Sequence, residues 1–178
     1  MPEPELLIVE GFADNSIELF TVLQSQVTWD ERMRARKTAS FGVAYNYSNI
    51  TYDAIPMHPL LIPIVDKLES CLGYRPNNCL LNFYPDGDAT MGFHSDATEE
   101  LSPGTGIAIV SLGSSRNITF RNKQDKSIEH AYRLLRGSLL HMSAEVQFSW
   151  KHAILVQPDT GARISLTFRQ IAPTRSVP

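Results

Sequence analysis

Apolar residues recur at helical intervals in two segments of the first third of the chain. The first segment follows Asn15, and its stripe consists of Ile17, Phe20, Leu23 and Val27. This spacing predicts an amphipathic helix. Asn15 and Glu18 have the spacing of a capping box, so we expect the helix to begin near Ser16.

The second helical stripe is bounded more clearly. Its apolar members are Leu61, Val65, Leu68 and Leu72. Pro59 suits the first position of a helix and Gly73 suits its end, so the pattern predicts a helix between these two residues. Pro63 must then lie in the first turn or distort it.

From about residue 78 onward, short strand-like segments replace the helical pattern. They are Asn78–Tyr84, Gly106–Gly113, Arg116–Arg121, Ser138–Ser143, Trp150–Gln157 and Arg163–Ile171. Residues typical of turns separate them. This many short strands in about a hundred residues predicts a β-sandwich or a jelly roll.

Composition narrows the class of protein. The chain has 178 residues, of which 43% are hydrophobic and 20% charged, as in a single globular domain rather than a coiled coil or a disordered tail. No apolar run approaches the roughly 20 residues that span a bilayer, so no membrane association is expected. The two cysteines and the acidic N-terminus predict an intracellular protein, placed in the cytoplasm, with the nucleus also compatible. Because the net charge is −3, a nucleic acid would need a local basic patch.

The clearest candidate chemistry is the triplet His94-Ser95-Asp96. On a strand, residues i and i+2 project from one face, so this imidazole and carboxylate can converge on one ion. A second histidine from elsewhere would complete the two-histidine, one-carboxylate set of non-heme Fe(II) oxygenases, which leaves coordination positions open. A lone triplet of this kind is also common in surface loops.

Three histidines of the β-rich region are candidates for the third ligand: His130, His141 and His152. Their spacing from His94 does not select one of them. We interpret His130 and His141 as surface or satisfied core imidazoles. His152 differs because of the strand that follows it.

That strand alternates strictly between apolar and polar residues. Its apolar members are Ile164, Leu166 and Phe168, and its polar members are Arg163, Ser165, Thr167 and Arg169. In an ordinary sheet the polar side would face solvent. Two arginines beside hydroxyl groups would also suit a dianionic ligand, because guanidinium groups bind carboxylates in a bidentate manner and stay charged when desolvated.

Taken in order, these pieces resemble the AlkB family of Fe(II)- and 2-oxoglutarate-dependent dioxygenases, which oxidatively remove alkyl groups from nucleic-acid bases. The matching pieces are Asn82-Phe83-Tyr84, His94-Ser95-Asp96, His152 and the strand Arg163–Arg169. Softer similarity extends from Arg36 to Ile171. Each motif is weak by itself, and the ordered set is specific.

The resemblance implies a mixed α+β, mainly β fold in one domain over residues 1–178. Residues 1–75 would form N-terminal helices and a nucleotide-recognition lid, and residues 76–172 a double-stranded β-helix, or jelly-roll, core. It further implies Fe(II) as the metal, with 2-oxoglutarate and O₂ as cosubstrates. We expect a monomer.

The resemblance also assigns roles to individual residues. The metal ligands would be His94, Asp96 and His152. The residues that bind 2-oxoglutarate would be Asn82, Tyr84, Arg163, Ser165, Thr167 and Arg169. Among these, Arg163 would take the distal carboxylate with help from Tyr84, and Arg169 would lie near Asp96 and the carboxylate on the iron side.

Substrate contacts are expected in the segment that resembles the family's lid, residues 36–48. Tyr45 and Tyr47 share one face of a strand there, where they could stack on a flipped base or simply pack. Arg36 belongs to a basic cluster with Arg32, Arg34 and Lys37 that could contact phosphates or form a solvated face. A second basic set, which could likewise contact phosphates or form a solvated face, consists of Arg116, Arg121, Lys123 and Lys126.

One position departs from the family pattern. Relatives that repair 1-methyladenine or 3-methylcytosine carry an acid two residues after the metal-binding aspartate, and here that residue is Thr98, followed by Glu99. Either Glu99 serves instead or the base preference differs.

The function expected from the sequence is oxidative dealkylation of N-alkylated bases in DNA or RNA, of the 1-methyladenine and 3-methylcytosine type, with release of aldehyde, succinate and CO₂. Thr98 and the negative net charge keep a second hypothesis open, a hydroxylase or demethylase of a protein or small molecule. A third is a nucleic-acid-binding module without catalysis. The sequence does not choose between DNA and RNA or between single and double strands.

Overall fold

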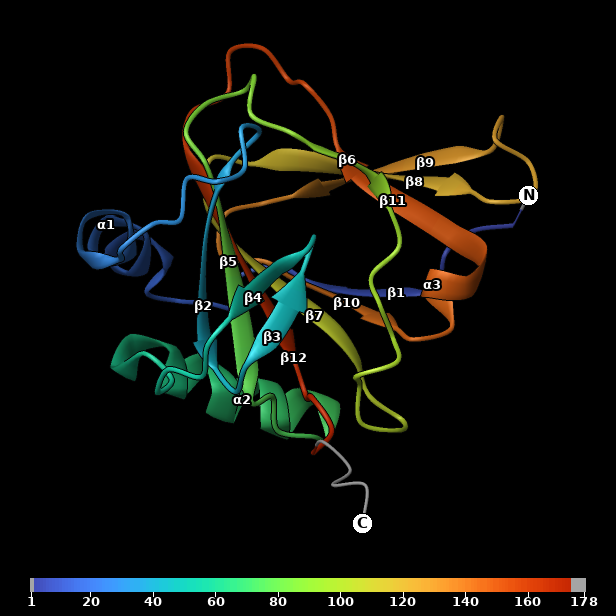
Figure 1. Cartoon of the computed structure of the whole chain (residues 1–178). Helices are drawn as coiled ribbons and strands as arrows, with labels where there is room; N and C mark the ends of the chain where they lie inside the picture. Colours follow the sequence, from blue (N-terminus) through green and yellow to red (C-terminus); the bar gives the residue numbers. More distant parts are fainter. Residues whose placement is uncertain (1, 174–178) are drawn as a thin grey trace.

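A six-stranded antiparallel sheet forms one wall of the protein (Figure 1). The computed structural model describes residues 2–173. In spatial order the strands of this sheet are β1 (Leu6–Val9), β10 (Leu139–Ser143), β7 (Gly106–Gly113), β12 (Arg163–Arg169), β5 (Asn78–Tyr84) and β2 (Lys37–Gly42). Strands from the two ends of the chain therefore lie in one sheet, with β12 near its centre.

A four-stranded antiparallel sheet forms the opposite wall, and a two-stranded hairpin lies beside them (Figure 1). The strands of the smaller sheet are, in order, β6 (Met91–His94), β11 (Trp150–Ile154), β8 (Arg116–Asn122) and β9 (Glu129–Leu134). The hairpin pairs β3 (Tyr45–Tyr47) with β4 (Ile50–Tyr52). Two facing antiparallel sheets confirm the prediction of a mainly β, jelly-roll fold.

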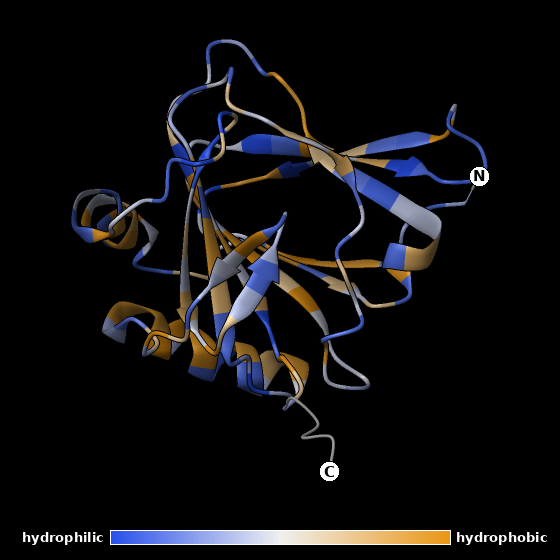
Figure 2. Ribbon diagram, viewed as in Figure 1, coloured by the Kyte–Doolittle hydropathy of each residue, from blue (hydrophilic) through white to orange (hydrophobic). Residues whose placement is uncertain are grey.

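Helices cover the outer face of the six-stranded sheet. They are α1 (Ser16–Gln26), the 3₁₀ turn η1 (Pro59–Leu61) and α2 (Ile62–Leu72), while the short α3 (Val146–Ser149) precedes β11. The apolar side of β12 packs in one cluster with Leu19 and Leu23 of α1 and with Val65 and Leu68 of α2. Figure 2 shows the hydrophobic colouring of α2 and of the large sheet, against more hydrophilic colours along β8 and β9.

Both predicted helices are present, with one difference in capping. The side chain of Asn15 makes no capping hydrogen bond, so α1 begins at Ser16 without the predicted capping box. Pro63 lies in the first turn of α2, and Gly73 ends that helix with a left-handed φ of 77°. The described residues contain no helix long and apolar enough to cross a membrane.

A second apolar cluster fills part of the space between the sheets. It draws on Ile107, Ile109 and Leu140 from the large sheet and on Ile118, Phe120 and Trp150 from the small one. Along β12, the apolar side chains thus face the helices while the polar ones face the interior. The alternative of a solvent-facing polar side is wrong, because every residue of β12 is buried.

The strand predictions differ from the structure mainly at the ends. Residues 155–157 lie beyond the end of β11, and residues 170 and 171 beyond the end of β12. Residues 1–75, expected to form N-terminal helices and a lid, also supply β1 and β2 to the large sheet, where β1 pairs with β10 and β2 with β5. The pattern did not predict β6 or β9.

Replacing Leu166 tests the assignment of the helix-facing core. Leu166 is fully buried, so Leu166→Ala should lower the free energy of unfolding by about 2–5 kcal/mol, measured by chemical denaturation. Leu155 is 43% exposed, and Leu155→Ala should change stability by no more than about 0.5 kcal/mol. Equal effects of the two substitutions would contradict this assignment.

Candidate metal centre and cosubstrate cavity

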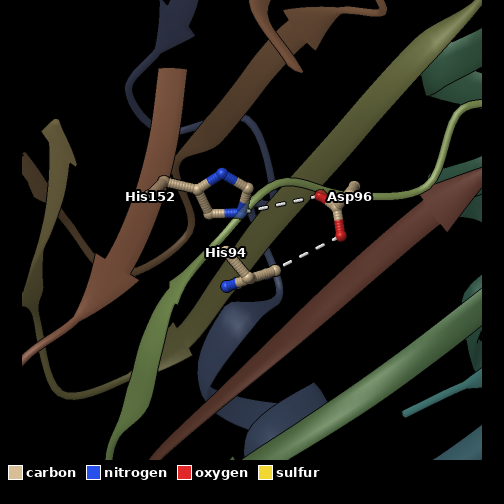
Figure 3. A group of neighbouring side chains, drawn as sticks. All are labelled: His94, Asp96 and His152. Atoms are coloured by element: carbon tan, nitrogen blue, oxygen red, sulfur yellow. Dashed lines mark ion pairs between the residues drawn. The ribbon is translucent and has the colours of Figure 1, made fainter. Parts of the chain in front are cut away.

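Two neighbouring strands of the small sheet bring the predicted metal ligands together. His94 of β6 and His152 of β11 are direct partners in the strand pairing, and their ring centroids lie 4.4 Å apart. Asp96 follows β6, and its carboxylate oxygens lie 3.8 Å from Nε2 of His94 and 3.6 Å from Nε2 of His152. One ligand atom from each residue falls within 4.8 Å of the others, so the three can bind a single ion (Figure 3).

Hydrogen bonds and burial prepare these groups for a metal. The Nδ1 of His94 lies 2.8 Å from the carbonyl oxygen of Gly92, which favours the tautomer protonated at Nδ1 and leaves the Nε2 lone pair free for a cation. Burial lowers the pKa of His152 to about 4, so this imidazole is neutral at neutral pH and free to bind a cation. The backbone N–H of Asp96 donates to Oε1 of Gln147 at 2.9 Å, which fixes the loop after β6.

Asp96 is also paired with an arginine of β12. Nη2 of Arg169 donates to Oδ1 of Asp96 at 3.0 Å, and both side chains are almost completely buried. Burial alone would raise the pKa of Asp96, but Arg169 and the two imidazoles together outweigh burial, so its pKa lies below the usual value. The carboxylate is therefore ionised and available as a ligand.

The interior carries more positive than negative charge. Its buried arginines are Arg36, Arg116, Arg163 and Arg169, while Asp96 is the one buried carboxylate among residues 2–173. In addition, Nε and Nη1 of both Arg163 and Arg169 are buried without a hydrogen-bond partner. Buried guanidinium groups without partners are costly, so the interior fits an anion with more than one carboxylate.

The polar side of β12 and its neighbour β5 line this interior. A small cavity beside the metal residues is lined by Asn82, Thr167 and Arg169 together with Met91, Ile109 and Tyr47. Farther along β12, Arg163 pairs with Tyr84 across the strands, and its guanidinium lies 5.3 Å from the Tyr84 ring. Its Nη2 donates to Oγ of Ser111 at 3.0 Å, while Ser165 lies buried between the two ends.

A cleft of about 440 Å³ opens beside the metal residues, under the hairpin β3–β4. Tyr45 and Tyr47 line it, with their rings stacked at 6.3 Å. Arg36 lies beneath them, where it donates to Oδ1 of Asn82 at 2.8 Å and to the Tyr47 hydroxyl at 2.6 Å. The guanidinium of Arg169 lies 4.8 Å from the Tyr45 ring, so the cleft adjoins the charged interior directly.

Comparisons with known proteins agree with this geometry. The sequence profile of the 2OG-Fe(II) oxygenase superfamily matches residues 11–169. Human DNA oxidative demethylase ALKBH2 is 34% identical over 175 residues, which cover 91% of this chain and 67% of that protein. The chain belongs to the AlkB family. As an AlkB-family protein it is an Fe(II)- and 2-oxoglutarate-dependent dioxygenase, with O₂ as the other cosubstrate.

Two further sequences and one solved structure are similar to this chain. An uncharacterised protein of Acanthamoeba polyphaga mimivirus is 34% identical over 161 residues, covering 89% of this chain and 83% of that one. The human alpha-ketoglutarate-dependent dioxygenase alkB homolog 3 is 29% identical, covering 86% of this chain and 56% of that one. The structure of OsALKBH1 shares the fold, with a TM-score of 0.74 at 16% identity over 96% of this chain and 100% of that one.

Other histidines of this AlkB-family chain lie outside the site. His130 contacts the Pro2 carbonyl and the Trp150 ring, and His141 contacts the Tyr74 hydroxyl. Burial lowers the pKa of His141. These contacts agree with the interpretation of both residues as structural imidazoles.

The two basic sets differ from the surfaces that the sequence suggested. In the first set, Arg32 pairs with Asp30, Lys37 pairs with Glu31 and Arg36 is buried, which leaves Arg34 exposed. In the second set, Arg116 is completely buried, so its placement on a basic face is wrong. In the first set, acidic residues close in sequence pair with Arg32 and Lys37. In the second set, tertiary packing buries Arg116.

The residues at the family's acidic position lie outside the cleft. The lining of the cleft ends in this segment at Ala97, and Thr98 begins a turn in which its carbonyl accepts the N–H of Leu101. Glu99 is exposed. Neither side chain is therefore placed against a base by this structure.

Several residues that shape the site carry no sequence signal. Gln147 and Ser111 each hydrogen-bond a residue of the site, yet no motif or spacing marks them. Gly42 is different, because its φ is +93° and a Cβ added there would lie 2.0 Å from the Asn77 carbonyl oxygen, so only glycine fits. This residue sets the path of the chain into the hairpin.

Removing the carboxylate of the metal site should abolish tight iron binding. In Asp96→Ala, two imidazoles remain and Arg169 loses its partner, so Fe(II) affinity should fall by at least about tenfold. Bound iron after anaerobic gel filtration measures the effect. His130→Ala is the matched control and should keep its iron, whereas full iron content in Asp96→Ala would exclude Asp96 as a ligand.

Proposed function

We propose that this protein oxidatively removes alkyl groups from N-alkylated bases of DNA or RNA. The observation that supports this most directly is the cleft in which two lid tyrosines face the candidate metal residues. The names of relatives add support, since ALKBH2 is called a DNA oxidative demethylase. The site is formed within one chain, so we propose that a monomer suffices.

In this proposal the metal ligands are His94, Asp96 and His152. The residues that hold 2-oxoglutarate are Asn82, Tyr84, Arg163, Ser165, Thr167 and Arg169. Arg163 would neutralise the distal carboxylate, because its Nε and Nη1 have no other partner, and Arg169 would keep Asp96 ionised and oriented. Bound Fe(II) would supply the oxidation chemistry with O₂ as the oxidant, one oxygen atom going to the alkyl carbon and the other to succinate as 2-oxoglutarate loses CO₂.

The chain's own task is to bring the alkyl carbon to the metal and to exclude water. A base in a duplex would have to leave the stack to enter the cleft, and aromatic side chains commonly hold such a base. Tyr45 and Tyr47 are placed for this, with Tyr47 anchored by Arg36. Hydroxylation of a carbon attached to nitrogen gives an unstable product that releases an aldehyde and restores the base.

Thr98, Glu99 and Arg36 were also expected to contact the substrate, but their positions differ from those of the two tyrosines. Arg36 is buried and bonded to Tyr47, so we propose that it supports the lid instead of touching phosphate. Thr98 and Glu99 would approach a base only if the loop after Asp96 moved inward. The base preference of this chain therefore rests on the lid more than on these two residues.

Formaldehyde release from methylated oligonucleotides tests the function. Oligonucleotides that carry 1-methyladenine or 3-methylcytosine should yield formaldehyde in a reaction that requires Fe(II) and 2-oxoglutarate. His94→Ala should reduce the rate to background, while His141→Ala, which alters a histidine outside the site, should remain active. Absence of formaldehyde from every methylated DNA and RNA tested would contradict the proposal, and stimulation of 2-oxoglutarate turnover by a protein or metabolite would favour the alternative substrate.

Replacing Tyr47 tests the lid. Loss of a ring that stacks on a base costs about 1–3 kcal/mol, so Tyr47→Ala should raise the KM for the methylated oligonucleotide by about tenfold or more. Tyr47→Phe keeps the ring and should retain most of the affinity. If Tyr47→Ala instead changed only the KM for 2-oxoglutarate, the residue would act through Arg36 and Asn82 and not on the base.

A further inference from the structure

Arg116 stands at the start of β8, in the sheet opposite Arg163, and is completely buried. Its Nη1 donates to the Asp86 carbonyl at 3.0 Å, and its Nη2 donates to the carbonyls of Leu155 at 2.8 Å, Ala89 at 3.0 Å and Gly87 at 3.4 Å. These bonds hold the loop between β5 and β6 against the segment after β11. The partners are neutral carbonyls, so the charge of Arg116 is not balanced by them.

Arg116 and Arg163 approach the same aromatic ring from opposite sheets. The guanidinium carbon of Arg116 lies 5.8 Å from the Tyr84 ring centroid, and that of Arg163 lies 5.3 Å from it. Arg163 also donates to Ser111, but its Nε and Nη1, and the Nε of Arg116, are buried without a partner. Two guanidinium groups beside one phenol ring therefore keep N–H donors that none of the described residues accepts.

No carboxylate of the described residues pairs with either arginine. Asp96 is the one buried carboxylate in residues 2–173, and it is bonded to Arg169 at the other end of β12. Burial lowers the pKa of Arg163, and the positive charge of Arg116 lowers it further. A ligand carboxylate at this end of the interior would relieve both the desolvation and the repulsion.

We propose that Arg116 is a second cationic residue of the pocket for the distal carboxylate of 2-oxoglutarate, and that it also positions Tyr84 there. This inference rests on the proposed role of Arg163. Arg163 bonds the carboxylate directly, while Arg116 adds its charge from the opposite sheet and anchors the loop that follows Tyr84. The pocket then discriminates between 2-oxo acids that have a distal carboxylate and those that lack one.

The test compares two ligands that differ by this carboxylate, 2-oxoglutarate and 2-oxobutyrate. Their dissociation constants are measured by calorimetry with the Fe(II)-loaded protein under anaerobic conditions, so no nucleic acid or turnover is involved. Arg116→Gln should weaken 2-oxoglutarate binding by about tenfold and leave 2-oxobutyrate binding nearly unchanged. Arg116→Lys keeps the charge but not all of the carbonyl bonds, so it should weaken 2-oxoglutarate binding less than Arg116→Gln does.

A merely structural role predicts a different pattern. In that case Arg116→Lys and Arg116→Gln would weaken both ligands to the same extent, because neither reproduces the four carbonyl bonds of the guanidinium, and the proposal would be overturned. Should Arg116→Gln fail to fold, the same two dissociation constants are measured for Arg163→Gln. Because Arg116 is intact in this variant, it should still bind 2-oxoglutarate several-fold more tightly than 2-oxobutyrate. Equal dissociation constants for the two ligands would refute the contribution of Arg116.

These outcomes are separate from the test of the proposed function. A wild-type protein that does not bind 2-oxoglutarate would contradict the proposed enzyme activity itself. Wild-type binding with an unaltered preference in Arg116→Gln would contradict the role of Arg116 alone.

Discussion

The excess of buried positive charge is the constraint on which the rest of the interior depends. A guanidinium removed from water is stable only where other groups replace its hydration, and the jelly roll supplies just one buried carboxylate, Asp96, in the part described. Arg169, at one end of β12, donates a hydrogen bond to that carboxylate, whereas Arg163, at the other end, donates among the described residues only to the hydroxyl of Ser111. Such an interior is stabilised by an anion, and the family assignment supplies one in the dicarboxylate 2-oxoglutarate.

The strict alternation of β12 produces both the core and the site. Ile164, Leu166 and Phe168 pack against the helices and fix the strand in the middle of the large sheet, with β5 and β7 on either side. Because successive side chains point to opposite faces, the same register places Arg163 and Arg169 in the interior. A shift by one residue would bury the apolar side against the charged cavity, so the packing of the core and the charge of the site specify one register.

The sequence predicted the elements whose patterns are local. β5 and β7 match their predicted bounds because they are continuous runs of buried residues, and α2 matches because its stripe, Pro59 and Gly73 agree. It did not predict β9, whose side chains alternate in exposure and carry charge, nor β6, which is interrupted by Gly92. The third metal residue was open until the resemblance indicated His152, because only the pairing of β11 with β6 places it opposite His94. Arg116 was misplaced for the same reason, since burial of a charge depends on distant loops.

Arg36 joins the two halves of the site. Its guanidinium bonds Asn82, which lines the small cavity beside the metal residues, and the hydroxyl of Tyr47, on the hairpin over the neighbouring cleft. Asn78 fixes the base of that hairpin by donating to the carbonyls of Phe41 and Val43. A displacement of Tyr47 would break its bond to a buried cation, which costs more than breaking an exposed one. The position of the hairpin β3–β4 and the hydrogen bonding of Asn82 in the small cavity therefore depend on each other through Arg36.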